Sequence, residues 1–213
     1  MKVNIFIKVL LILISSVVYS QESMKSNKSM KSNKGEYLMH MDIGIATLEA
    51  ENIFKTNAQV LEVFVGKEFL MNNTWAIITG IEHSKVKSDY SSLINEQLFL
   101  TNNYLSLPLY FQGEYKSTDK LTVYARVGFY ASYLYYSKLE NINLNQNSSN
   151  KNLGLNYGAQ IGLGINYKIA EDLGVLYGVK SKSDMFNNYR DSKQEFKLTN
   201  FYALEFGLIF NVF

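Results

Sequence analysis

Apolar residues recur at every second position between residues 153 and 169. The series comprises Leu153, Leu155, Tyr157, Ala159, Ile161, Leu163, Ile165, Tyr167 and Ile169. Glycine, asparagine, glutamine and lysine occupy the positions between them. Because successive side chains of a β-strand point to opposite faces, the segment is predicted to be a strand with one apolar face and one face of small and polar groups. The alternation resumes at Leu173 and continues to residue 182, which predicts a hairpin.

The glycines on the polar face indicate which face points inward. A water-soluble barrel or sandwich packs its large side chains inside, whereas a membrane barrel exposes them to lipid and keeps small and polar groups in its lumen. Gly154, Gly158, Gly162 and Gly164 all share the polar face of the strand. The second arrangement explains them better, so we expect a transmembrane hairpin.

The same period of two marks six further segments, so the chain is predicted to be all-β. The fold expected is an eight-stranded antiparallel transmembrane β-barrel. Its strands are predicted at residues 38–45, 60–69, 75–82, 104–114, 121–133, 153–169, 173–182 and 202–212.

The connections between these strands alternate in length. Three are short, and they cover residues 70–74, 116–120 and 170–172. Four are long and rich in Asn, Ser, Lys and Asp, and they cover residues 48–58, 85–101, 137–152 and 183–200. Membrane barrels have short periplasmic turns and long extracellular loops. A soluble lipocalin-like barrel can also have eight strands, but it has no reason to segregate loop lengths by end.

Two local features interrupt the pattern. Pro108 cannot donate a hydrogen bond to a neighbouring strand, which predicts a bulge at that position. Residues 91–100 are too apolar for a free loop. That segment is therefore expected to fold over the barrel mouth, to extend the following strand above the membrane, or to contact a partner.

The N-terminus is predicted to be a secretory signal peptide, residues 1–20. Lys2 and Lys8 precede an apolar run, and Ser20 provides a small residue at the expected cleavage site. The alternative is a membrane-spanning helix, which needs ~20 apolar residues and so more than the run after Lys8 supplies.

A perfect six-residue repeat follows, with the sequence SMKSNK at residues 23–28 and again at 29–34. A short polar and cationic repeat cannot bury an apolar core. We therefore expect a disordered linker over residues 21–35 and the barrel domain over residues 36–213.

Composition narrows the possible functions. Aromatic residues make up 14% of the chain and tyrosine dominates, which suits the aromatic girdles of a membrane protein. The mean hydropathy is −0.09, as expected when half of each strand is polar. The absence of cysteine excludes disulfides and cysteine-based sites. Loss of Lys2 and Lys8 with the signal peptide lowers the 21 basic residues to 19, equal to the 19 acidic residues, so nothing supports binding to nucleic acid.

Three segments carry a family resemblance. Residues 104–109 (YLSLPL) resemble a YLxxPL strand, and residues 162–169 (GLGINYKI) resemble a GxGxxYxI strand before a tight turn. Residues 205–212 (EFGLIFNV) are similar to the insertion signal of last strands. These motifs resemble those of small outer-membrane β-barrel proteins, in particular PorT-like and related barrel domains. The resemblance implies residence in the cell outer membrane, contact with outer-membrane lipid, and recognition by the barrel-assembly machinery.

Neither histidine indicates an enzyme. His83 and Ser84 are consecutive in a predicted strand, so they point to opposite faces and cannot form a nucleophile and base pair. His40 and Asp42 share an inward face, where they are expected to form a hydrogen bond; the alternative is a metal site. No glycine-rich phosphate loop precedes a helix. We therefore expect no catalytic residue, no cofactor and no resident metal.

Six charged residues are predicted to meet in the lumen at mid-height. They are Asp42, Glu62, Glu82, Arg126, Lys180 and Glu205. An unpaired buried charge costs several kcal/mol, so these groups are expected to pair or to share hydrogen bonds with Tyr124, Tyr130 and Gln160. Lys180 and Glu205 are expected to be neighbours across one strand pair. The competing interpretation is that the charges line a wet, charge-selective channel.

Two functional classes follow. The first is a non-enzymatic surface, envelope or secretion-accessory protein that contacts an unidentified protein or ligand through its extracellular loops. The second is a narrow channel or carrier for a small solute or lipid. At eight strands the side chains fill the interior, which favours the first class.

Overall fold

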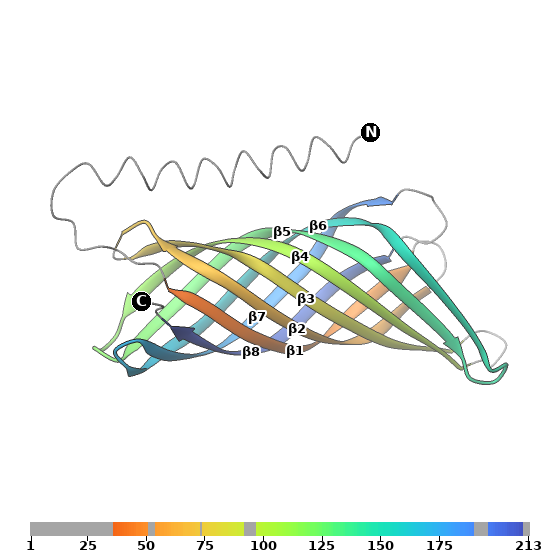
Figure 1. The fold of residues 1–213 in the computed structure, drawn as a ribbon, viewed down its shortest axis with the longest axis horizontal. Helices are drawn as coiled ribbons and strands as arrows, with labels where there is room; N and C mark the ends of the chain where they lie inside the picture. Colours follow the sequence, from red (N-terminus) through yellow and green to blue (C-terminus); the bar gives the residue numbers. More distant parts are fainter. Residues whose placement is uncertain (1–35, 51–53, 73, 92–96, 190–195, 211–213) are drawn as a thin grey trace. The chain divides into compact units, whose positions relative to one another are not determined.

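Every strand pairs with both of its neighbours, and the pairing of β1 with β8 closes the sheet into a barrel (Figure 1). The structure is a computed structural model that describes residues 36–50, 54–72, 74–91, 97–189 and 196–210. All pairs are antiparallel, which confirms the predicted fold. The strands are β1 (Tyr37–Ala50), β2 (Phe54–Leu70), β3 (Trp75–Ser91), β4 (Gln97–Lys116), β5 (Leu121–Asn141), β6 (Gln146–Ala170), β7 (Leu173–Tyr189) and β8 (Phe196–Phe210).

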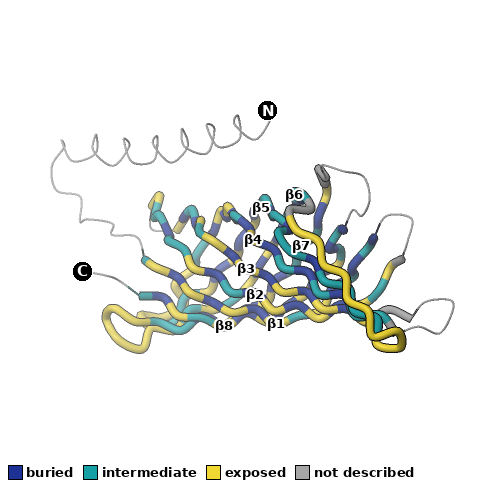
Figure 2. The backbone as a smooth tube through the Cα atoms, turned by 45° about the vertical axis from the view of Figure 1, so that its right-hand side comes forward, coloured by how far each residue is buried: buried dark blue, intermediate teal, exposed yellow. Residues whose placement is uncertain are grey.

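The alternation of residue types determines which side chains face outward. On β6, Ile161 and Leu163 are each 60% exposed, whereas Gly162 between them is buried. Figure 2 shows the same succession of buried and exposed residues along the other strands. The predicted parity is therefore correct, with aliphatic side chains outside and small or polar ones inside. A barrel with an apolar exterior belongs in lipid.

The strands are longer than the sequence pattern indicated. At the turn end of the barrel, the connections are residues 71–74, 117–120 and 171–172, close to the prediction. At the opposite end, which we call the loop end, most residues predicted as loops continue the strands. Glu49 of β1 still pairs with Lys55 of β2, for example, and Phe99 of β4 pairs with Glu140 of β5. Above the membrane the outer face meets water instead of lipid, so outward residues become polar and the apolar alternation in the sequence fades although the backbone hydrogen bonding continues.

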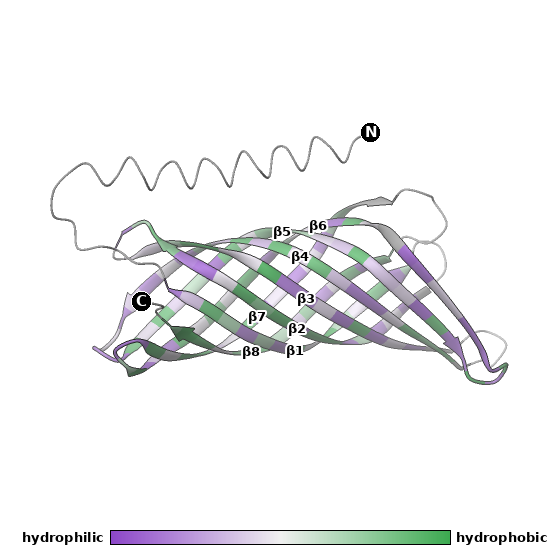
Figure 3. Cartoon of the chain, in the orientation of Figure 1, coloured by the Kyte–Doolittle hydropathy of each residue, from purple (hydrophilic) through white to green (hydrophobic). Residues whose placement is uncertain are grey.

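The strands therefore project beyond the bilayer at the loop end. A transmembrane strand needs only ~9–11 residues, whereas β5 has 21 and β6 has 25. Hydrophilic segments gather toward this end in Figure 3. Of the three alternatives for residues 91–100, the extension of the following strand is correct from Gln97 onward.

The predicted bulge at Pro108 is wrong. Thr79 pairs with Leu109 and Glu82 pairs with Ser106, so β4 keeps one register against β3 past the proline. Pro108 also pairs in register with Tyr130 of β5, and its carbonyl accepts a hydrogen bond from the Thr79 hydroxyl at 2.9 Å. The register shift between β4 and β5 falls at Asn103 and Tyr104 instead.

The predicted signal peptide and linker, residues 1–35, lie outside the described residues. Among the residues that are described, no helix is long and apolar enough to cross a membrane.

Candidate functional site in the barrel lumen

The six charged residues predicted for the lumen all point into it. Each is at most 4% exposed, and they come from six of the eight strands: Asp42 (β1), Glu62 (β2), Glu82 (β3), Arg126 (β5), Lys180 (β7) and Glu205 (β8). Together with the further members named below, we call this set the lumenal network.

Lys180 is the hub of one half of the network. Its Nζ lies 2.6 Å from Glu62 and 3.0 Å from Glu82, and it also contacts Asp42. Lys182, two residues along the same face of β7, pairs with Glu62 and lies 3.0 Å from the other oxygen of Glu82. Two ammonium groups thus lie among three carboxylates contributed by β1, β2 and β3.

Arg126 is the hub of the other half. Its guanidinium pairs with Glu205 and lies 4.5 Å from the centre of the Tyr110 ring. The Tyr124 hydroxyl donates to the same carboxylate at 2.8 Å. Asp42 is the direct partner of Glu205 in the β1–β8 register, so the two halves of the network meet there.

The predicted partners are correct only in part. Tyr124 does bind a carboxylate of the cluster, but the Tyr130 hydroxyl donates to Asp184 at 2.6 Å, and Gln160 accepts from Tyr110 at 3.0 Å. The predicted pairing of Lys180 with Glu205 is wrong, because Lys180 lies opposite Ala203. The register of β7 against β8 is two residues away from the one expected. A period of two gives the face on which each residue lies but not the register between two strands, so the sequence pattern did not specify it.

Three members of the network were missed. Lys182 and Asp184 follow Lys180 at the same inward parity, but the sequence assigned Asp184 to a loop. Asp184 is instead buried and accepts hydrogen bonds from Tyr130, from Asn156 at 2.7 Å and from the backbone of Leu198 at 2.7 Å. Ser84 donates to Glu62 at 2.7 Å. The predicted strand 173–182 already had Lys182 on its inward face, and continuing the period-two count by two residues would have found Asp184.

Glycines of β6 provide the space for the large polar side chains of β5. In the register of β5 against β6, Tyr124 lies opposite Gly164, Arg126 opposite Gly162 and Tyr130 opposite Gly158. Each pair thus joins one large side chain with one glycine. A β-carbon at any of the three glycines would meet the side chain opposite. The glycines of β6 therefore leave the space that large side chains of the lumenal network occupy.

Apolar layers cover the network above and below. At the loop end, buried side chains from six strands form one cluster: Ala46, Leu48, Ala50, Ala58, Val60, Val86, Leu100, Tyr104, Leu134, Phe196, Leu198, Phe201 and Ala203. At the turn end a second cluster comprises Leu38, Phe64, Ile78, Tyr110, Tyr124, Leu176 and Ile209. The charges are thus enclosed between two layers of packed side chains.

Two groups of buried ligand atoms lie close enough to hold a metal ion. They are His40 with Asp42 and Glu205, and Asp42 with Glu62 and Glu82. Lys180 already contacts all three carboxylates of the second group, and Arg126 binds Glu205 of the first. His40 Nδ1 lies 2.9 Å from Asp42 Oδ1, the hydrogen bond that the sequence predicted. Protein cations thus already compensate these carboxylates.

His83 and Ser84 lie on opposite faces of β3, as predicted. The exposed His83 ring lies 2.9 Å from the Tyr135 hydroxyl on the outside, whereas Ser84 is buried against Glu62. These two side chains therefore do not form a catalytic pair.

Three solved structures are similar to this chain over most of their length. The solved structure of neisserial surface protein A is 9% identical, with a TM-score of 0.52 over 83% of this chain and 97% of that one. Ail of Yersinia pestis is 14% identical (TM-score 0.45; 83% and 99% covered), and OprG of Pseudomonas aeruginosa is 11% identical (TM-score 0.47; 83% and 95% covered). A search of curated proteins found no match.

A family model described as the outer membrane protein beta-barrel domain matches residues 9–210. This match covers most of the chain, and the fold and the apolar exterior agree with it. The chain therefore belongs to the outer membrane protein beta-barrel domain family and resides in the cell outer membrane.

Proposed function

We propose that this protein is a non-conducting, non-enzymatic barrel that holds a protein-contact surface above the outer membrane. The observation that carries the proposal is the filled lumen, in which a charged layer lies between two apolar layers. A hydrated ion would have to leave its water to pass either apolar layer, and this is costly. The channel alternative would need a water-filled path, whereas packed side chains of both clusters occupy the lumen on either side of the charged layer.

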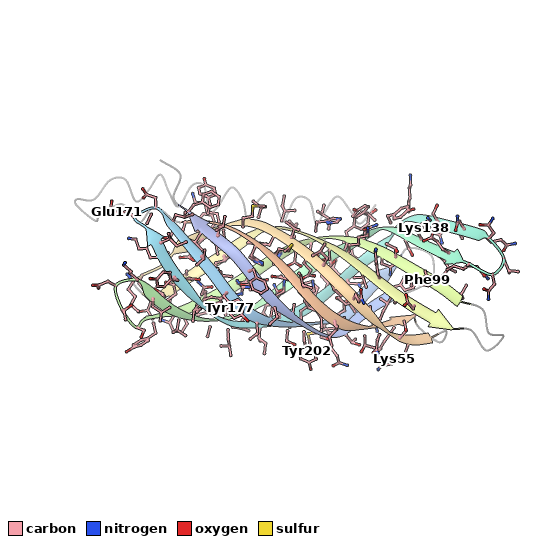
Figure 4. All side chains as sticks on the ribbon, turned by 90° about the horizontal axis from the view of Figure 1, so that it is seen from below. Lys55, Phe99, Lys138, Glu171, Tyr177 and Tyr202 are labelled. Carbon is pink, nitrogen blue, oxygen red and sulfur yellow. The ribbon has the colours of Figure 1, made fainter. Side chains whose placement is uncertain are left out.

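The loop end supplies the contact surface. Short turns face the periplasm in bacterial membrane barrels, which places the loop end outside the cell. In Figure 4, Lys55 and Lys138 lie at this end and Glu171 lies at the other. The barrel wall continues here above the lipid as a platform, and apolar side chains pack inside it.

The β5–β6 hairpin is the most prominent part of this platform. Its tip, residues 142–145, exposes Ile142 and Leu144 at 59% and 54% among polar neighbours. The turn is held by a hydrogen bond from the Leu144 amide to the Asn141 side chain at 3.1 Å. Two aliphatic side chains presented on an ordered, protruding turn fit contact with another protein.

Site-specific photocrosslinking in intact cells tests this proposal. A photoreactive residue at Leu144 should give a discrete crosslinked protein, because this position contacts the partner. The matched control is the same residue at Leu163, which is 60% exposed but faces lipid. The proposed surface role would be contradicted if Leu144 gave no crosslinked protein, or if both positions gave the same crosslinked proteins.

A further inference from the structure

We propose that the outward face of β3 at the loop end binds the phosphate of a lipid headgroup through Lys85 and Lys87. The site lies on the exterior of the barrel, away from the lumenal network and from the hairpin tip.

The first observation is its position at the edge of the apolar exterior. Going toward the loop end, the outward aliphatic side chains finish at Leu61 on β2, Ile81 on β3 and Leu105 on β4, which are 43%, 56% and 45% exposed. The next outward residue is polar on each strand: Gln59, His83 and Asn103. Lys85 follows His83 and pairs with both Leu61 and Asn103. It therefore lies where hydrocarbon gives way to headgroups.

The second observation is uncompensated charge. Lys85 and Lys87 are both exposed on one face of β3, about 7 Å apart along the strand. Among the described side chains, no carboxylate lies within ion-pair distance of either ammonium. Asp89 is the next residue on the same face, one step further from the lipid.

Two other lysines at the loop end have acidic partners. Lys55 lies 2.6 Å from Glu49, and this hydrogen bond holds the pKa of the Glu49 carboxyl below its ordinary value. Lys138 likewise lies 2.6 Å from Glu140. The two β3 lysines thus remain available to an external anion, whereas Lys55 and Lys138 are already paired.

The third observation is a set of polar groups beside the lysines. The ring of His83 reaches across the outside of β4 to the Tyr135 hydroxyl of β5, at 2.9 Å. Asn103 lies between these strands and directly opposite Lys85. Amide and hydroxyl groups beside two ammonium groups match the several acceptor oxygens of a phosphate.

Adjacency to lipid identifies the source of the phosphate. A lipid whose chains pack on Leu61, Ile81 and Leu105 presents its headgroup at the height of Lys85, which raises its effective concentration. Free phosphate has no such anchor, so we expect lipid-borne phosphate to bind and inorganic phosphate to bind weakly.

The test uses the purified barrel in a neutral detergent. Binding of a short-chain phosphatidic acid is measured by native mass spectrometry for the wild type, for the K85Q/K87Q variant and for the matched K55Q/K138Q variant. Each lysine near a membrane surface favours anionic lipid by about a factor of five, so K85Q/K87Q should bind roughly thirtyfold more weakly. The K55Q/K138Q variant should bind like the wild type, and a hundredfold excess of inorganic phosphate should not displace the lipid.

Three results would overturn the proposal. One is unchanged lipid binding by K85Q/K87Q. Another is an equal loss of lipid binding by K55Q/K138Q, which would show that only the overall charge of the loop end attracts the lipid. The third is efficient displacement by inorganic phosphate, which would indicate a simple anion site. Because all four lysines are on the exterior, heat-modifiable gel migration verifies that each variant retains its fold.

Discussion

At the scale of single residues, the lumen shows how buried charges are tolerated. Arg126 has a carboxylate partner in Glu205 and an aromatic face in Tyr110, and Lys180 contacts three carboxylates. Asp184 has no described cation at ion-pair distance but accepts hydrogen bonds from neutral donors. Each charge thus has partners that offset its desolvation, so removing one partner should cost more than the pair contributes.

Replacing Arg126 by Ala should destabilise the barrel by about 3–5 kcal/mol, because Glu205 is left as a buried anion without its cation. The measurement is equilibrium urea unfolding in detergent or lipid vesicles. The exposed pair of Lys138 and Glu140 provides the control, and Lys138→Ala should cost under about 1 kcal/mol.

A second substitution separates loss of the cation from loss of packing. In the double variant with Glu205→Gln, the uncompensated charge is gone, so part of the lost stability should return. If Arg126→Ala costs no more than Lys138→Ala, or if Glu205→Gln deepens the loss additively, the ion pair is not what stabilises this region.

The members of the network could be predicted from parity, but their partners could not. The alternation of side chains along a strand predicts which residues point inward, and Lys180 and Glu205 both do. Which carboxylate Lys180 meets depends on the register between strands and on the reach of a long side chain across the lumen. Lys180 extends toward β1, β2 and β3 instead of toward its neighbour β8.

At the scale of elements, β5 and β6 form a complementary pair of strands. Tyr124 lies over Gly164, where its hydroxyl reaches Glu205. The sequence showed the glycines of β6 as a feature of the lumen side, but only the register shows which side chain each one accommodates. In the same way, hydrophobic alternation located the membrane-spanning part of each strand and missed the extension above the lipid.

Gly164→Ala should destabilise the barrel by about 1–3 kcal/mol, because the added methyl group would overlap the Tyr124 hydroxyl, which binds Glu205, and the Tyr177 carbonyl oxygen. Gly174 of β7 is the matched control, since a β-carbon there would lie 3.4 Å from its nearest neighbour, the Tyr167 carbonyl oxygen. Gly174→Ala should therefore be near neutral in the same urea titration. Equal effects at the two glycines would show that the β5–β6 complementarity does not matter.

At the scale of the whole molecule, the barrel divides into layers along its axis. An apolar layer, a charged layer and a second apolar layer follow one another inside it, while the exterior changes from aliphatic to polar toward the loop end. This arrangement is consistent with the proposed membrane anchor, whose lumen is filled by packed side chains.

Single-channel recording in planar lipid bilayers tests the closed lumen most directly. We predict that the refolded wild-type barrel shows no steady conductance above the baseline of the bare bilayer. Arg126→Ala should lower stability without producing an ion-selective current. Steady current steps in the wild type, with a cation preference that Arg126→Ala shifts while stability stays unchanged, would contradict the account and make the lumen a charge-selective channel.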